Sequence, residues 1–373
     1  MDKISIALGF DNRYCTLAAG TIASIIEHAS DKYSYDIYIF HYDISEQNQQ
    51  IIKSINSKDN IDIKFRFFDF ENLYQSDEVY LWGRFTKIIY YVLFIDKLLP
   101  NLEKVLCLDT DMIITSDLVS LYNTDITEYA LAACVDLGPK YGGGVNFFRN
   151  KAFSPYNSDF DSYGNRYNYY TKYVGLNDSQ LETYFNAGVL LFNIKKSGDI
   201  YKKKLSSILN KKHFMPEQDK LNYLFREDKL IMDERYNVPV NRVPNFITEN
   251  HKLPDVIHYL AVPKPIYSMT RPADAEYWKT IAKTDYFYPA LDTFINQKIK
   301  DGISNSVNDP HALDDLLHNL GRIKALKRRQ KFIRILIKPL VNNKKYMKLK
   351  KRPVQFFNDS KSTAIRFLGK FYF

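Results

Sequence analysis

The chain has 373 residues, of which 45% are hydrophobic, so it can bury a large core and is not an intrinsically disordered protein. The three cysteines are too few for a disulfide framework. No apolar run reaches the ~20 residues of a membrane-spanning helix, and the first residues lack a signal peptide's apolar core. The net charge of +9 is unevenly divided, because residues 322–373 carry 17 Lys or Arg and one acid, whereas the rest carries 35 bases and 42 acids. We therefore expect a cytosolic or peripheral protein with an acidic body and a basic tail.

Strands and helices alternate along the first part of the chain. Apolar runs predict strands at 4–10, 35–40, 61–68 and 105–108, and longer amphipathic or apolar segments predict helices at 17–28, 45–55 and 85–99. Further strands are expected at 131–135 and 184–194, followed by a helix at 220–225. This alternation is typical of an α/β fold with a mostly parallel sheet and right-handed crossovers.

Two carboxylates follow the apolar run that ends at Leu108, in the sequence VLCLDTDMIIT. Ligands of open α/β sheets collect at the carboxyl ends of the strands, so Asp109 and Asp111 are expected to face a cleft. Carboxylates two residues apart in an extended chain lie on the same side and can bind one divalent cation. The alternative is a polar strand end with a capping aspartate, which is about equally common for an isolated D-x-D.

Residues 137–183 form a long polar segment that is rich in tyrosine and contains the run Gly142, Gly143 and Gly144. A loop of this length inside a domain is usually functional or disordered, and the many tyrosines argue against disorder. We therefore expect the insertion to be ordered and functional, with the glycine run allowing it to close as a lid.

With these pieces in order, the first 270 residues or so resemble glycosyltransferase family 8, which includes bacterial lipopolysaccharide galactosyl- and glucosyltransferases. The resemblance depends on LDTD, YFNAGVLLFNIKK, EQDKLN and HYLAVPKP, whose order and spacing together are specific. It implies a GT-A fold, that is, a Rossmann-like mixed sheet, over residues 1–285. It also implies a Mn²⁺- or Mg²⁺-dependent transfer from a UDP-hexose with retention of anomeric configuration. Because tyrosine rings stack on sugar faces, the insertion at 137–183 is then expected to border the acceptor cleft.

The resemblance also implies roles for individual residues. Asp109 and Asp111 match metal ligands, with His258 as the third, although an isolated histidine beside Tyr259 would more often be a core residue. The positions that match contacts to the nucleotide and its sugar are Asp11, Tyr14, Thr110, Asn186, Ala187, Gly188 and Lys264. Gln218 matches the residue beneath the anomeric carbon, Glu217 its sugar-binding neighbour, and Asp136 a carboxylate that lines the sugar site.

Three positions depart from the family pattern. Val92 stands where the family has a donor-contacting arginine, and Arg84, Lys87 and Arg13 are the candidates to replace it. Ala261 stands where a glycine is usual, and Glu217 replaces an aspartate. These departures leave open a non-catalytic or weakly active nucleotide-sugar-binding protein.

The basic tail intersperses bases with apolar residues such as Phe332, Ile333 and Leu336. This pattern predicts a mainly helical region, here residues 286–373, that binds an anionic membrane surface at the inner membrane face. A solvated helical appendage and a nucleic-acid-binding segment are the alternatives, and the acidic body without nucleic-acid motifs argues against the latter. We thus expect a transferase acting on a lipopolysaccharide or other glycolipid acceptor, or alternatively on a glycoprotein.

Overall fold

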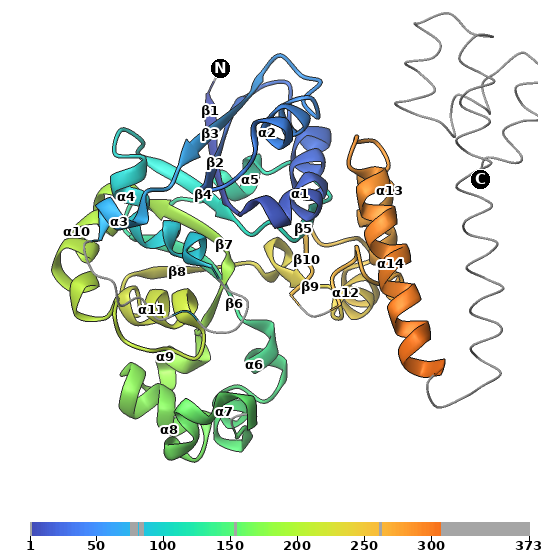
Figure 1. Cartoon of the computed structure of the whole chain (residues 1–373). Helices are drawn as coiled ribbons and strands as arrows, with labels where there is room; N and C mark the ends of the chain where they lie inside the picture. Colours follow the sequence, from blue (N-terminus) through green and yellow to red (C-terminus); the bar gives the residue numbers. More distant parts are fainter. Residues whose placement is uncertain (1, 75–80, 82–85, 153–154, 261–262, 307–373) are drawn as a thin grey trace, which may run out of the picture. The chain divides into compact units, whose positions relative to one another are not determined.

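The computed structural model describes residues 2–74, 81, 86–152, 155–260 and 263–306. Within these ranges, seven strands form one sheet in the order β3-β2-β1-β4-β7-β6-β8 (Figure 1). The first four strands in this order run parallel, and β7 is antiparallel to both of its neighbours. Their bounds are β1 (Lys3–Gly9), β2 (Ser34–His41), β3 (Ile61–Phe67), β4 (Lys104–Leu108), β6 (Leu131–Val135), β7 (Phe185–Asn193) and β8 (Lys229–Met232). The expected α/β fold with a mostly parallel mixed sheet is confirmed.

A second, three-stranded sheet has the order β5-β10-β9. It joins β5 (Met112–Ile114), which directly follows the two aspartates, to β10 (Val256–His258) and β9 (Val238–Pro239). The pairing is antiparallel between β10 and β5, with His258 opposite Met112. A histidine nearly 150 residues away in sequence is thereby placed beside the aspartate turn.

The central strands are apolar runs because both faces of the sheet are covered. Residues 4–8 of β1 and 105–108 of β4 are all buried, as expected for parallel strands with helices on each side. The helices are α1 (Cys15–His28), α2 (Glu46–Lys53), α3 (Phe70–Leu73), α4 (Ile95–Leu98), α5 (Val119–Tyr122), α6 (Leu137–Tyr141), α7 (Val145–Asn150), α8 (Arg166–Asn168), α9 (Asp178–Glu182), α10 (Ile194–Lys204), α11 (Pro216–Leu224), α12 (Val243–Asn250), α13 (Asp274–Ile281) and α14 (Phe287–Ser306).

Two predicted elements differ from the structure. The helix expected over 85–99 is a 3₁₀ helix over Lys87–Phe94 that continues into α4, because its β-branched and aromatic residues lose side-chain freedom in an α-helix and are fixed here by burial. The polar segment 137–183 contains the short helices α6 to α9, which gather at one end of the molecule below α11 in Figure 1. Helices of three to six residues are too short to show a hydrophobic period in sequence.

The insertion has a hydrophobic core of its own. Phe148, Phe160, Tyr169 and Tyr170 are buried in it together with Leu181 from α9. Most of its tyrosines therefore pack on one another, whereas Tyr141 is half exposed, with its hydroxyl donating to Glu234 and the Arg242 guanidinium over its ring.

Contacts divide the chain into two compact units, one of residues 1–262 with 271–273 and one of residues 263–270 with 274–373. In the second unit, the Trp278 ring of α13 packs edge-on against Phe287 and Phe294 of α14, and its Nε1 donates to the Pro265 carbonyl at 3.2 Å. The basic tail lies outside the described residues. The division expected at residue 285 stays a prediction.

Candidate functional site

The polar residues of the site meet at one edge of the large sheet. β1 and β4 are parallel neighbours with Leu8 opposite Leu108, so the turns that contain Asp11 and Asp109 leave the sheet at the same edge. β7 runs the other way and begins at this edge, where the Asp109 N–H donates to the Gly188 carbonyl at 2.9 Å. The expected Asn-Ala-Gly turn at 186–188 is thus part of β7, and the reversed direction of this strand brings these residues beside the two aspartates.

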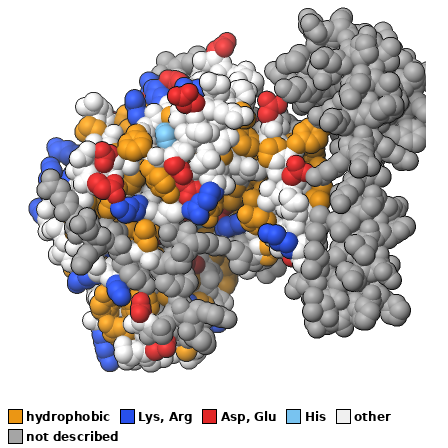
Figure 2. Space-filling model, viewed as in Figure 1, with side chains coloured by type: hydrophobic (Ala, Val, Ile, Leu, Met, Phe, Trp, Pro, Cys, Tyr) orange, Lys and Arg blue, Asp and Glu red, His pale blue; other side chains and the backbone are white. Residues whose placement is uncertain are grey.

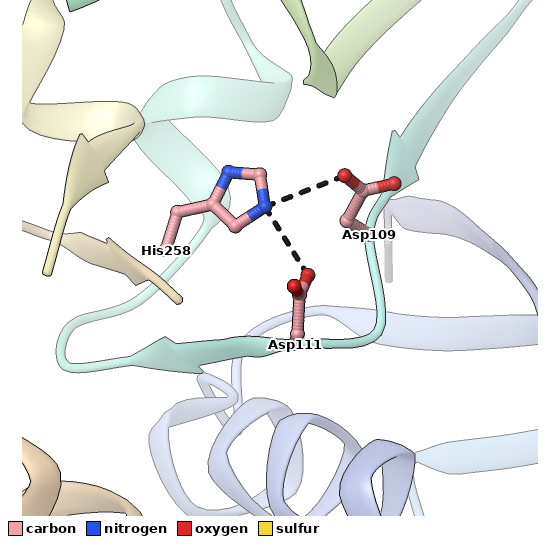
Figure 3. Close-up of side chains that lie close together, drawn as sticks. All are labelled: Asp109, Asp111 and His258. Atoms are coloured by element: carbon pink, nitrogen blue, oxygen red, sulfur yellow. Dashed lines mark hydrogen bonds and ion pairs between the residues drawn. The ribbon is translucent and has the colours of Figure 1, made fainter. Parts of the chain in front are cut away.

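Asp109, Asp111 and His258 point toward one another (Figure 3). His258 Nε2 lies 3.1 Å from Asp111 Oδ1 and 3.3 Å from Asp109 Oδ2, and the three ligand atoms lie within 4.8 Å of one another. In an octahedral site with ligand bonds of about 2.1 Å, neighbouring donor atoms are about 3 Å apart. Two carboxylates and one imidazole at this separation fit a site for a divalent metal ion.

The turn that contains Asp109 and Asp111 is stabilised by Thr21, a residue that the sequence did not single out. Thr21 of α1 is fully buried, and its hydroxyl lies 2.8 Å from the Thr110 carbonyl and 3.1 Å from the Met112 N–H. Thr110 itself is buried, so it would contribute to a nucleotide site through its backbone, whose carbonyl Thr21 holds in place. A threonine inside an apolar helix is the only sequence signal, and it does not identify its partner.

A chain of amide hydrogen bonds orients His258. The Ala187 N–H donates to Gln218 Oε1 at 3.0 Å, so the Asn186 group facing that oxygen is its Nδ2, which also donates at 3.0 Å. Asn186 Oδ1 accepts from the Gly188 N–H and from Asn237 Nδ2. Asn237 Oδ1 then faces His258 Nδ1 at 2.8 Å, which fixes the proton on Nδ1 and leaves Nε2 toward the aspartates.

Asn237 is therefore a second site residue that sequence reasoning missed. It is 3% exposed, lies between His258 and Asn186 of β7, and follows the 3₁₀ turn Glu234–Tyr236. Metal-binding histidines usually donate their second ring N–H to an oxygen acceptor, and Asn237 supplies this acceptor.

The pKa of His258 depends on its burial and on the two neighbouring aspartates. Burial of the ring lowers its pKa, but the negative charge of Asp111 and hydrogen bonds to Asp109 and Asp111 outweigh this effect and raise the pKa to about 9. Without a metal ion the ring is thus protonated at neutral pH, so a cation that binds Nε2 must compete with a proton.

The pKa values of Glu217 and Asp136 are also shifted. Burial raises the pKa of Glu217 to about 7, and the Asp109 carboxylate adds to this effect. Glu217 Oε2 is buried and has no hydrogen-bond partner among the described residues. Burial also raises the pKa of Asp136, whose carboxylate accepts from the Gly138 N–H at 2.9 Å and from Gln218 Nε2 at 3.4 Å. Gln218 therefore contacts both Asp136 and Asn186.

Asp11 lies in the turn after β1 and is 1% exposed. It accepts hydrogen bonds from Arg13 Nη2 at 2.7 Å and from the Tyr42 hydroxyl at 3.3 Å, and Tyr14 closes the turn through its N–H to the Asp11 carbonyl. Arg13 therefore lies at this turn, paired with Asp11. Lys87, by contrast, forms an ion pair with Glu71.

The remaining predicted residues lie outside this group of contacts or outside the described residues. Val92 is a core residue whose carbonyl accepts from the Tyr201 hydroxyl at 2.9 Å. Lys264 is buried in the second unit, so its role at the diphosphate stays a prediction. Arg84 and Ala261 lie outside the described residues.

The chain is similar to known glycosyltransferases. It is 26% identical over 247 residues to a putative glycosyltransferase of Haemophilus influenzae, with 64% of each chain covered. It is 23% identical over 300 residues to a lipopolysaccharide 1,2-glucosyltransferase of Escherichia coli, covering 75% of this chain and 78% of that protein. It thus spans less than two thirds of the Haemophilus protein.

Solved structures show the same fold. The bifunctional glycosyltransferase WbbM superposes with a TM-score of 0.66 at 24% identity, over 79% of this chain and 52% of that one. The galactosyltransferase LgtC, solved with donor and acceptor sugar analogues, gives a TM-score of 0.58 at 20% identity over 76% and 96%. The expected GT-A fold is therefore confirmed.

The sequence profile of glycosyl transferase family 8 matches residues 5–266, a range that contains all the residues gathered at this edge of the sheet. The chain belongs to glycosyl transferase family 8.

Proposed function

We propose that the protein transfers a hexose, galactose or glucose, from a UDP-hexose to a glycan acceptor with retention of configuration. The observation that carries this proposal is the group Asp109, Asp111 and His258, which continuous hydrogen bonds join to Gln218. A metal site and an amide fixed in orientation are thus held together at one sheet edge.

The residues would divide the work between the two ends of the donor. Asp109, Asp111 and His258 would hold Mn²⁺ or Mg²⁺, which would neutralise charge on the diphosphate as it leaves. Asp11 and Tyr14 would contact the uridine, Thr110 would fix the turn beneath it, and Lys264 would add positive charge. On the sugar side, Asn186, Ala187 and Gly188 would approach the hexose, with Glu217 and Asp136 as hydroxyl acceptors.

Gln218 would act beneath the anomeric carbon. Its Oε1 already accepts two hydrogen bonds, so the amide is held in one orientation as positive charge develops on the sugar. The acceptor oxygen would form its bond to the anomeric carbon on the face from which the diphosphate departs, and its proton would pass to the departing phosphate oxygen.

Two departures from the family pattern support the alternative that the protein binds a nucleotide sugar without efficient turnover. Val92 packs in the core and cannot contact a donor, and Glu217 is one methylene longer than the family's aspartate. Arg13 is the described base best placed to compensate, because it lies on the Asp11 turn.

The proposal is tested by UDP release from UDP-galactose and UDP-glucose, with Mn²⁺ or EDTA, first without acceptor and then with a glycan panel. Release that depends on Mn²⁺ and on one acceptor supports hexose transfer and identifies the acceptor as lipopolysaccharide, another glycolipid or a glycoprotein glycan. UDP binding without release under any condition would establish the binding protein instead.

We also propose that the protein is cytoplasmic and peripheral on the inner membrane face, where it meets a glycolipid acceptor. The similarity to a lipopolysaccharide glucosyltransferase and the basic tail support this proposal. Among the described residues, no helix is both long and apolar enough to cross a bilayer. Acidic, basic and hydrophobic side chains are interspersed over the described residues on the face shown in Figure 2, so this face carries no concentrated basic patch.

Deleting residues 322–373 should release the protein from anionic vesicles. The tail holds 17 bases and one acid, and each base near an anionic leaflet contributes about 1 kcal/mol at most, so even partial engagement gives measurable binding. The measurement is co-sedimentation of both forms with anionic and neutral liposomes over a range of salt. Equal binding of both forms would contradict the anchor, and tighter binding to RNA or DNA than to vesicles would favour the nucleic-acid alternative.

A further inference from the structure

The hydrogen-bond chain that begins at His258 does not end at Gln218. Gln218 Nε2 lies 3.3 Å from the Tyr184 hydroxyl, which can accept its hydrogen because it donates its own proton to Asp219 Oδ1 at 2.5 Å. The Tyr184 hydroxyl thus joins Asp136, Asn186 and the Ala187 N–H in fixing the orientation of the Gln218 amide. The direction of this hydroxyl depends in turn on Asp219.

Asp219 is completely buried and accepts three hydrogen bonds from described residues. Its Oδ2 accepts from the Tyr169 hydroxyl at 2.7 Å and from the Met215 N–H at 3.0 Å, while Oδ1 accepts from Tyr184. The Tyr169 oxygen also accepts from the Phe214 N–H at 2.8 Å, so every group has a defined donor or acceptor role.

Tyr169 is supplied by the insertion, not by the sheet. It begins a π-helical turn over Tyr169–Val174, a rare geometry that occurs frequently at functional sites. Its ring is fully buried in the insertion's own core, against Phe160 and Tyr173. The hydroxyl is therefore held by packing on one side and presented to Asp219 on the other.

We propose that Tyr169 and Asp219 are positioning residues that set the orientation of the Gln218 amide, so that the insertion supports the sugar end of the site. The catalytic consequence rests on the proposed hexose transfer. Without the Tyr169 proton, Asp219 Oδ2 keeps only the Met215 hydrogen bond, and the carboxylate can rotate. The Tyr184 hydroxyl then follows Asp219, and Gln218 Nε2 loses one of its two acceptors and keeps only Asp136.

The test compares Tyr169→Phe with wild type in two independent measurements. Selective ¹⁵N-glutamine labelling reports the side-chain amide of Gln218, whose signal is assigned by its loss in Gln218→Glu. We expect this signal to shift and broaden in Tyr169→Phe. Steady-state kinetics should show kcat lower by about tenfold with the KM for the UDP-hexose changed by less than about twofold, because the nucleotide and metal contacts are untouched.

Tyr173→Phe is the matched control, since its ring stacks on Tyr169 but supplies none of the three hydrogen bonds to Asp219. It should leave both measurements at the wild-type value. Asp219→Asn has one acceptor oxygen in place of two and should shift the Gln218 signal in the same way. It provides a second, independent variant in case Tyr169→Phe does not fold. An unchanged Gln218 signal, or an unchanged kcat in an active enzyme, overturns the inference. If wild type itself shows no turnover, the proposed function fails while the Gln218 signal still decides this inference.

Discussion

Asp111→Asn should abolish Mn²⁺ binding and reduce hexose transfer by about a thousandfold while leaving the fold intact. Asp111 is half-buried and faces the Nε2 of a fully buried histidine, so Asp111→Asn removes one of the two anionic ligands of the group. Calorimetric titration with Mn²⁺ and the UDP-release assay measure the two effects. Asp62→Asn, at an exposed position of β3, is the matched control and should behave as wild type.

A pH series without metal separates loss of the site from loss of the fold. Because the folded pKa of His258 is raised to about 9 above its ordinary value of 6.5, its pairing with the aspartates stabilises the protein fully below about pH 6.5. That contribution is lost as the pH rises through about 9. In the presence of EDTA, the difference in unfolding free energy between wild type and Asp111→Asn should therefore shrink over this window. Mn²⁺-stimulated turnover in Asp111→Asn, or turnover indifferent to EDTA, would contradict the metal site.

Gly188→Ala should destroy the same site by crowding. A β-carbon at this position would overlap His258 Cε1 and lie 2.9 Å from Asn186 Oδ1, and neither side chain is a flexible end that can move away. The histidine would have to leave Asn237, at a cost of about 1–3 kcal/mol in stability. Denaturant unfolding measures this cost, and Mn²⁺ titration should show that metal binding is lost.

Gly164→Ala provides the contrast. Gly164 has a φ of +74°, but a β-carbon added there would meet no described atom within 4 Å, so alanine adds backbone strain without crowding. It should lower stability by about 1 kcal/mol and leave Mn²⁺ affinity unchanged. Wild-type Mn²⁺ affinity in Gly188→Ala would show that His258 does not need its observed position.

The sequence predicted those parts of the structure whose signals are local. The apolar runs of β1, β2 and β4 marked buried strands because both faces of the sheet are covered, and Asp109 and Asp111 were recognisable because they interrupt such a run. Three cysteines were expected to be too few for a disulfide framework, and Cys15, Cys107 and Cys134 are buried free thiols.

Other features depend on contacts between distant segments. Thr21 and Asn237 are single polar residues in helix and turn sequences, and only the fold shows that one supports the aspartate turn and the other orients His258. β5, β8 and β9 have two to four residues each, too few for a pattern. The role of His258 came from family resemblance, since an isolated histidine before a tyrosine indicates no ligand.

The insertion leaves and re-enters the sheet at one place. The Asp136 N–H, at the end of β6, donates to the Tyr184 carbonyl, just before β7, at 2.8 Å. Two chain ends that close together can be joined by segments of very different length, because neither strand has to move. This segment can thus be exchanged in evolution without moving β6 or β7. On the proposed roles of the insertion and of Tyr169, such an exchange would change acceptor preference, and each replacement segment would have to present a hydrogen-bond donor to Asp219.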